Sequence, residues 1–514
     1  MRSGDAGRRG PVHVPSFYIR CRNVSMRDRA EPPSWVQTMA HTTVEIDSLL
    51  RSLGKQREGK SVLDVAKSLQ SEGQPQPAPQ AAAPASRPKQ EGGAARSETG
   101  KFFPAAPKSL QEAGLQDTEV AGLILKFLYH RRADTGFRIS QQLGLRLPVI
   151  EGLLRQMKQD RFVVYKGSAA GGDYVYELTE IGLEQARGLS EQCTYFGAAP
   201  VPLRQYVASV KAQTLASARP SLARIREAFT DLSMSEELTS RVAQAIYAGR
   251  GMFLYGNAGN GKTSIAARIT KAFGDAIWIP KSLGISGEVV RLFDPNKHKE
   301  VPPDASTAKH VDSRWVRIER PTIMVGGELR MENLEIAYTR GSGIGEAPLQ
   351  LKANCGTLLI DDFGRQRMEV DELLNRWIVP LEERHDFLYL ESGRTIQVPF
   401  DELIVFSTNL EPRDLVEEAC LRRIPYKIEV MDPSEKQYRT LFLDLAKSMG
   451  IDCKPEAVNY LIDKHYTGAD RGMRFCHPRD LLRQIENYCK VHGEPLVATT
   501  ERVDMAVLNY FSIM

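Results

Sequence analysis

A glycine-rich loop at residues 256–263, GNAGNGKT, constrains the fold of this chain more than any other part of the sequence. The loop fits the pattern G-x-x-x-x-G-K-[ST], whose glycines let successive backbone N–H groups turn inward and hold phosphate at a helix N-terminus. An apolar run at 252–255 precedes the loop, and a helix-forming run, SIAARITKAF, follows it. Strand, loop and helix therefore stand in the order that a phosphate-binding α/β sheet requires.

The loop predicts a binding site for ATP with Mg²⁺. We expect Lys262 to reach the β- and γ-phosphates and the hydroxyl of Thr263 to bind the metal ion. The nucleotide-binding residues predicted in this loop are Gly256, Asn257, Ala258, Gly259, Asn260, Gly261, Lys262 and Thr263.

Two further apolar runs predict strands that end in polar residues. TLLIDDFG, residues 357–364, delivers Asp361 and Asp362 to the carboxyl end of its strand, the edge at which open α/β sheets bind ligands. We expect Asp361 to hold the Mg²⁺ shell and Asp362 to be the base or the positioner of the attacking water. A later strand, LIVFSTN, ends at Asn409, which can orient that water.

Beyond Pro433 the apolar spacing predicts four helices and no further strand. Pro478 suits the first turn of the third helix, so we expect Arg479 near the N-terminus of that helix, facing the γ-phosphate. Just before this region, Arg422 and Arg423 lie between a predicted helix and a predicted strand, in ACLRRIPYKIEV.

In this order, the motifs resemble those of an AAA+ ATPase, and the resemblance covers residues 220–514. It implies a homo-oligomeric ring, commonly a hexamer, with ATP bound between subunits. It also implies that Arg422 and Arg423 act as arginine fingers on the nucleotide of a neighbouring subunit, and that Asn409 and Arg479 serve as sensors.

Residues 353–409 are similar to MoxR-type ATPases and to bacterial enhancer-binding activators, with DFLYLESGRTIQVPF predicted as a hairpin before the strand that ends at Asn409. The GAFTGA loop of the activators is absent, which counts against transcriptional activation by that route. Asp362 stands where these families usually have glutamate, which is one methylene longer, so the resemblance leaves the rate of hydrolysis open.

Length and composition set the broad class of the protein. The 514 residues suffice for two or three domains of about 150 residues each. The 68 basic and 64 acidic residues give a net charge of +4, which provides no electrostatic case for non-specific binding to nucleic acid. No run approaches the roughly 18 apolar residues of a membrane span. Seven cysteines without a CxxC pair indicate a reduced, cytoplasmic protein with neither a disulfide framework nor a zinc site.

Residues 1–108 are predicted to be a disordered tail followed by a linker rich in proline and alanine. Residues 1–38 are rich in arginine, but their acidic residues and four prolines favour a tail or an over-extended gene start over a targeting peptide. Residues 72–108 contain seven prolines and mark a domain boundary.

Residues 109–192 are predicted to form a winged-helix-like domain of three helices and a two-stranded wing. In DNA-binding versions the third helix, here opened by Pro148, enters the major groove. Residues 109–191 include ten basic and eleven acidic side chains, whereas a DNA reader concentrates positive charge. This balance favours docking to a protein, with DNA as the alternative partner.

The remaining segments complete the domain plan. We expect 193–219 to be a connector, 220–432 the nucleotide-binding α/β domain and 433–514 its helical lid. Within the α/β domain, 277–295 is predicted as a hairpin. The glycine-rich run 338–346 has two interpretations, a mobile loop that meets substrate and, as the favoured one, an ordinary solvated loop.

The sequence thus predicts an α/β fold: a P-loop AAA+ parallel sheet with a C-terminal helical lid, preceded by a winged-helix-like domain and a disordered arm. The predicted function is hydrolysis of ATP in a ring that remodels an unidentified protein client. One alternative is a DNA-directed ATPase, such as an initiator, loader or regulator, that reads DNA through the winged helix. Another is a nucleotide-gated scaffold that hardly hydrolyses ATP because of Asp362.

Overall fold

The computed structural model describes residues 102–274, 276–416 and 418–512. The predicted tail and most of the predicted linker, residues 1–101, lie outside the described residues. Within the described ranges, no helix is both long and apolar enough to cross a membrane.

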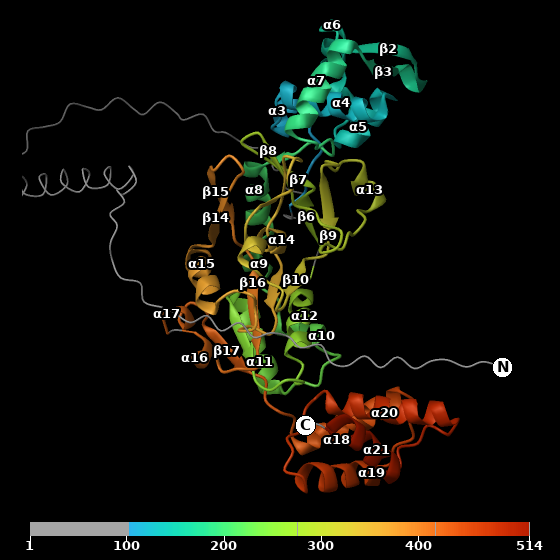
Figure 1. Cartoon of the computed structure of the whole chain (residues 1–514), viewed down its shortest axis with the longest axis vertical. Helices are drawn as coiled ribbons and strands as arrows, with labels where there is room; N and C mark the ends of the chain where they lie inside the picture. The colour runs from blue at the N-terminus through green and yellow to red at the C-terminus, as the bar shows by residue number, and fades with distance from the viewer. Residues whose placement is uncertain (1–101, 275, 417, 513–514) are drawn as a thin grey trace, which may run out of the picture. The chain divides into compact units, whose positions relative to one another are not determined.

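The centre of the fold is a parallel sheet of five strands in the order β10-β13-β16-β5-β17 (Figure 1). Parallel strands that are buried on both faces are nearly continuous apolar runs, as the three central strands β13, β16 and β5 are. The predicted α/β P-loop fold is therefore confirmed. The strands are β5 (Met252–Tyr255), β10 (Thr322–Val325), β13 (Thr357–Ile360), β16 (Leu403–Thr408) and β17 (Tyr426–Glu429).

Helices cover both faces of this sheet, because successive residues of a strand point to opposite sides. Met252 and Leu254 pack against the first group of helices, whereas Phe253 and Phe406 pack against the second group together with Trp377. The first group is α10 (Leu222–Ala228), α11 (Glu236–Ala248) and α12 (Lys262–Phe273). The second group is α14 (Leu349–Ala353), α15 (Val370–Glu383), α16 (Pro412–Leu415) and α17 (Glu418–Leu421).

The four helices predicted after Pro433 are present and share a core of their own. Inside it the hydroxyls of Tyr438 and Tyr466 are 2.9 Å apart, and the Tyr466 hydroxyl lies 2.8 Å from Nδ1 of His477. Burial lowers the pKa of His477 to about 4, so the imidazole is neutral at neutral pH. The helices are α18 (Glu435–Ser448), α19 (Pro455–Leu461) with a π-helical turn at Ile462–Thr467, α20 (His477–His492) and α21 (Thr500–Phe511).

Two smaller sheets are built largely from the segment between α12 and β13. One has the strand order β11-β12-β8-β7-β4, and the other pairs β6 with β9. The hairpin predicted over 277–295 is therefore smaller than expected: β7 and β8 form it, whereas β6 leaves to pair with β9. The elements are β4 (Val201–Pro202), β6 (Ile277–Pro280), β7 (Ser282–Ile285), β8 (Glu288–Arg291), α13 (Ala305–Ala308), β9 (Trp315–Ile318), a 3-10 turn (Met331–Leu334), β11 (Ala337–Tyr338) and β12 (Ile344–Glu346).

The glycine-rich run 338–346 is held in place as the turn between β11 and β12. The Thr194 N–H donates to the Ser342 carbonyl over 2.8 Å, and the Cys193 thiol donates to the Gly343 carbonyl over 3.3 Å. These bonds fasten the turn to the end of the region 110–192, so neither interpretation from the sequence anticipates its role as a contact between two parts of the fold.

The segment 193–219, expected to be a connector, is an integral part of the fold. It contains β4, an edge strand of the sheet β11-β12-β8-β7-β4, and two helices, α8 (Leu203–Gln213) and α9 (Leu215–Ala218). The amide of Gln213 exchanges two hydrogen bonds with the backbone of Trp278, at 2.7 and 2.9 Å. This segment was not recognised because its partners lie on the inserted strands, far along the chain.

The hairpin predicted before β16 is present as β14 (His385–Tyr389) and β15 (Thr395–Pro399), which pair antiparallel. Its turn is bonded to strand β8 of the sheet β11-β12-β8-β7-β4, since the backbone N–H groups of Glu391 and Ser392 both donate to the Glu288 carboxylate over 3.1 Å. Leu388 and Val398 pack into the core that this sheet shares with α8. The hairpin and the inserted sheet are therefore one packed unit.

The region 110–192 contains the three expected helices, α4, α5 and α6, and the expected hairpin of β2 and β3, together with α3, β1 and α7, which the sequence interpretation lacked. Strand β1 joins the hairpin to make a sheet of order β1-β3-β2, and α7 packs along α4. The elements are α3 (Leu110–Ala113), α4 (Asp117–Arg131), β1 (Ala133–Thr135), α5 (Gly136–Leu143), α6 (Leu147–Gln159), β2 (Val163–Ser168), a 3-10 turn (Ala170–Gly172), β3 (Tyr174–Leu178) and α7 (Glu180–Gln192).

The predicted linker 72–108 ends earlier than expected, because residues 102–107 pack against the β6–β9 pair. The ring of Phe102 lies 5.5 Å from that of Trp315, and the ring of Phe103 lies 6.2 Å from that of Trp278. The Asp312 N–H donates to the Pro104 carbonyl over 2.9 Å. Partial burial of two phenylalanines against two tryptophans offsets some of the entropy that a proline-rich segment loses on ordering.

The arginine of a buried ion pair in the inserted segment also binds the region 110–192. The guanidinium of Arg314, only 1% exposed, binds both carboxylate oxygens of Asp312, which is 3% exposed. It also donates to the carbonyl of Ala113 over 3.1 Å, at the end of α3. One N–H of the Arg314 guanidinium thus keeps its acceptor, the Ala113 carbonyl, only while the two parts stay together.

We expect Arg314→Ala to destabilise the protein by about 3–5 kcal/mol, because it leaves the Asp312 carboxylate buried without its partner. Chemical denaturation measures the loss. Lys299→Ala is the matched control, since Lys299 pairs with Glu319 at the surface and its side chain is 75% exposed. Equal midpoints for the two variants would contradict the structural role of the buried pair.

Candidate functional site

The glycine-rich loop predicted to bind phosphate leaves β5 at Gly256 and enters α12 at Lys262. Gly256, Gly259 and Gly261 have φ angles of 128°, 86° and 83°, a region that glycine adopts readily. A Cβ on Gly256 would also lie 2.6 Å from the carbonyl oxygen of Val430. The glycines therefore provide both the turn and its close approach to the segment after β17.

Lys262 is largely buried and points back over the loop. Its Nζ donates to the carbonyls of Gly256 and Asn257 over 2.9 and 3.0 Å, and to Oδ1 of Asn409 over 2.7 Å. Burial lowers the pKa of the lysine below its usual value, and the nearby carboxylates of Asp361 and Asp362 oppose this shift. Lys262 and Asn409, predicted separately, are thus in direct contact.

Thr263 meets the acidic pair at the end of β13. Its hydroxyl donates to Oδ2 of Asp361 over 2.8 Å. Asp362 has a φ of 47°, which is uncommon for a residue with a side chain, and its N–H donates to Oδ1 of Asp361 over 3.1 Å. The amide of Gln366 donates to the carbonyls of both aspartates and supports this turn.

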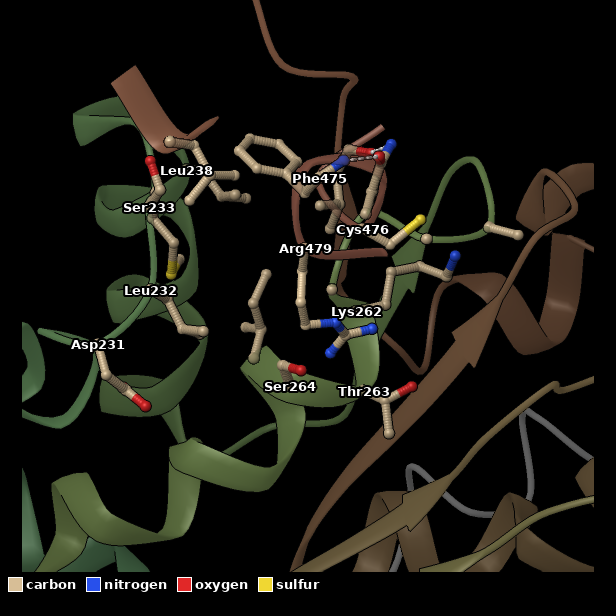
Figure 2. A pocket seen from close by; sticks show the side chains of 18 of the residues that line it. Asp231, Leu232, Ser233, Leu238, Lys262, Thr263, Ser264, Phe475, Cys476 and Arg479 are labelled. Atoms are coloured by element: carbon tan, nitrogen blue, oxygen red, sulfur yellow. Dashed lines mark hydrogen bonds between the residues drawn. The ribbon is translucent and has the colours of Figure 1, made fainter. Parts of the chain in front are cut away.

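These side chains line a cavity of about 500 Å³. One end is polar and is formed by the loop, the aspartates and Asn409; Figure 2 shows Lys262 and Thr263 there. The other end is largely apolar: Leu232, Leu238 and Phe475 lie there, with Asp231 and Ser233 on the same segment as Leu232 (Figure 2). The remaining apolar residues of the lining are Met234, Ile265, Val430, Leu441 and Leu445.

The sequence interpretation missed the apolar end. Leu232 and Leu238 come from the segment before α12, and Leu441 and Phe475 come from the helical domain. In the sequence such residues look like any other core leucine or phenylalanine. Only the knowledge that two regions close over the loop could have selected them.

Arg479 lies in the first turn of α20, as predicted, and belongs to the cavity lining. Figure 2 shows its side chain directed toward the segment that carries Lys262 and Thr263. Its Nε lies 3.0 Å from Oδ1 of Asp480, and about half of the side chain is exposed. The guanidinium can therefore reach a bound anion if it leaves this surface pair.

Arg422 and Arg423 do not reach this cavity. They precede β17, whose first residue pairs with the first residue of β5, whereas the loop follows the last residue of β5. The length of β5 alone separates them from the loop by at least about 10 Å. They line a second cavity of about 420 Å³ together with Arg250, and Arg423 pairs there with Glu382 at 2.8 Å.

Residues 434–509, which comprise most of the helical domain, match a family described as a domain of unknown function, DUF8689. None of the curated proteins matches the sequence significantly. Similar solved structures include the RuvB Holliday junction branch migration motor of Thermotoga maritima, with 15% identity over 57% of this chain and 74% of that chain and a TM-score of 0.33. NtrX from Brucella abortus in complex with ATP has 13% identity over 55% of this chain and 60% of that chain, with a TM-score of 0.35. Similarity at this level does not carry the activity of either protein over to this chain.

Alanine substitutions at two glycines of the loop distinguish the destabilisation caused by a steric clash from that caused by backbone strain. We expect Gly256→Ala to lower the free energy of unfolding by about 3 kcal/mol or more, because the methyl group would collide with the Val430 carbonyl and the φ angle disfavours alanine. Gly261→Ala meets no atom within 4 Å and should cost only the backbone strain, about 1–2 kcal/mol. Denaturant unfolding of both variants measures the difference, and equal losses would rule out the close approach as the reason for glycine at 256.

Proposed function

We propose that this chain is an AAA+ ATPase that binds ATP with Mg²⁺ and hydrolyses it in a ring of identical subunits. The observation that carries the proposal is the contact between Thr263 and Asp361 beside Lys262, at one cavity. Asp361 ends a strand that is separated from β5 by β16. A glycine-rich turn that served only to connect β5 to α12 would not require a hydrogen bond from Thr263 to a carboxylate two strands away in the sheet.

ATP fits the two ends of the cavity. The phosphates would bind the backbone N–H groups of the loop at the N-terminus of α12, where the helix dipole favours negative charge. The base would lie among the apolar side chains between Leu238 and Phe475. Lys262 would exchange neutral carbonyl acceptors for a phosphate, and such charge-assisted hydrogen bonds are roughly twice as strong.

Thr263 and Asp361 would hold Mg²⁺. This ion prefers oxygen ligands and binds to NTPases through one or two protein side chains, several waters and the phosphates, which fits a hydroxyl and a carboxylate 2.8 Å apart. Once bound, Mg²⁺ neutralises charge on the phosphate oxygens.

Asp362 and Asn409 are proposed to act on the attacking water. Both line the polar end of the cavity, on the two adjacent strands β13 and β16. The carboxylate of Asp362 would accept a hydrogen bond from the water and align it with the γ-phosphate, while Asn409 would hold it from the side. Arg479 would approach the same phosphate from the helical domain.

Arg422 and Arg423 are proposed to complete the site of a neighbouring subunit. They lie at the opposite edge of the sheet from the loop of their own chain, so they can contribute to hydrolysis only in trans. Arg422 is exposed, whereas Arg423 would first have to leave Glu382. An arginine supplied in this way stabilises charge that develops in the transition state.

The proposed output of hydrolysis is the remodelling of a protein partner. The region 109–191, with ten basic and eleven acidic residues, is the proposed docking domain, with a winged-helix-like fold. Its lack of excess positive charge supports a protein over DNA as the partner. Stimulation of the ATPase rate by duplex DNA would favour the alternative, a DNA-directed ATPase.

Two substitutions separate binding from hydrolysis. We expect Lys262→Ala to weaken ATP binding at least tenfold, because the phosphates lose their cation. Asp362→Asn should bind ATP within about threefold of the wild-type affinity and lose about 100-fold or more in kcat, since only the alignment of water is affected. Titration with a fluorescent ATP analogue and steady-state ATPase assays measure the two effects. If both variants lose binding equally, the assigned roles are wrong.

The role in trans is tested by mixing variants. Arg422→Ala and Arg423→Ala should bind ATP normally, and at least one should lose about 1,000-fold in kcat. Addition of inactive Lys262→Ala chains should restore turnover, because they supply intact arginines to the nucleotide of their neighbours. The mass of the oligomer is recorded alongside, and no rescue at any mixing ratio would exclude an intersubunit site.

A further inference from the structure

Asp432 occupies the junction between the sheet domain and the helical domain. Strand β17 ends at Glu429 and α18 begins at Glu435, with Ser434 as its N-cap, so Asp432 lies in the short link between them. Any change in the orientation of the helical domain must turn this link. The partners of Asp432 therefore bear on how the two domains are joined.

On one side, Asp432 holds the phosphate-binding loop. Nδ2 of Asn260 donates to Oδ1 of Asp432 over 2.7 Å, and Nδ2 of Asn257 lies 3.2 Å from both carboxylate oxygens. Both asparagines occupy variable positions of the loop pattern, and both bind Asp432 through their side-chain amides. The backbone of the loop is thus free to bind phosphate while its side chains bind the link.

On the other side, Asp432 holds the helical domain. The guanidinium of Arg474, just before α20, binds Oδ2 of Asp432. The next two residues contact the loop itself: the Phe475 N–H lies 3.5 Å from Oδ1 of Asn260, and the Cys476 N–H donates to the Gly259 carbonyl over 3.0 Å. A single carboxylate therefore joins the loop, the link and the helical domain.

Asp432, Asn257 and Arg474 are not among the residues that line the 500 Å³ cavity, whereas Asn260, Phe475, Cys476 and Arg479 are. A nucleotide in the cavity would therefore affect Asp432, Asn257 and Arg474 only through other residues. A carboxylate suits this position, because it offers about four acceptor sites to two amide groups and a guanidinium.

We propose that Asp432 is a positioning residue that transmits nucleotide occupancy from the phosphate-binding loop to the helical domain. The inference rests on the proposed function, since it takes ATP as the ligand of the loop. A phosphate that draws the loop inward moves Asn257 and Asn260, and through Asp432 it moves Arg474 and the start of α20. Arg479, five residues after Arg474, lies in the first turn of α20.

The test measures amide hydrogen exchange with and without saturating ATPγS and Mg²⁺. In the wild type, nucleotide should slow exchange in both α12 and α20. In Asp432→Ala, saturating nucleotide should still protect α12 but lose at least half of the protection of α20. Glu435→Ala is the matched control, because it removes a nearby surface carboxylate whose ion pair, with Arg439, lies within α18.

Affinity provides a second, independent measurement. Asp432→Ala should weaken binding of a fluorescent ATP analogue about tenfold, and Asp432→Asn should weaken it less, because an amide still offers an acceptor to Asn260. Asn257→Ala and Arg474→Ala should each weaken binding severalfold in the wild type, but less than twofold in the Asp432→Ala background. Loss of these two effects in the Asp432→Ala background would show that Asn257 and Arg474 act on nucleotide binding through Asp432.

The outcomes distinguish the two proposals. If the wild type binds no nucleotide, the proposed function fails. If the wild type binds it and Asp432→Ala keeps both its affinity and the protection of α20, the role of Asp432 is overturned. Unchanged effects of Asn257→Ala and Arg474→Ala in the Asp432→Ala background would overturn it equally.

Discussion

The order and register of β13, β16 and β5 form the constraint on which the rest of the site depends. Because the three strands run parallel and are paired in register, their carboxyl ends emerge side by side. Lys262 can then touch Asn409 at 2.7 Å, and Thr263 can touch Asp361 at 2.8 Å. A slip of one residue in β13 would turn its side chains to the opposite face and break the second contact.

The sheet and the polar half of the site could be predicted from the sequence, because their signals are local. The loop at 256–263 has fixed spacing, and Asp361 and Asn409 each follow a continuous apolar run. The same holds for the hairpin β14–β15 and the four helices after Pro433, whose turns and periodicity lie within short windows.

The remainder could not be predicted because it depends on partners far apart in the sequence. Phe102 follows a proline-rich stretch and packs against Trp315, more than 200 residues further along the chain. Gln213 became part of the fold through the backbone of Trp278. The apolar end of the cavity and the partners of Asp432 come from two domains, and the spacing of residues in the sequence does not show which side chains of the two domains are in contact.

The packing of residues 102–107 decides where a mechanical load enters the fold. A pull on the chain that precedes Phe102 is borne first by the contacts of two phenylalanines with Trp278 and Trp315, and only then by α3. Among the described residues, the β6–β9 pair is therefore the first part of the fold to bear that load. The region 110–192, although next in sequence, is shielded from that tension and stays coupled to the same strands through Arg314.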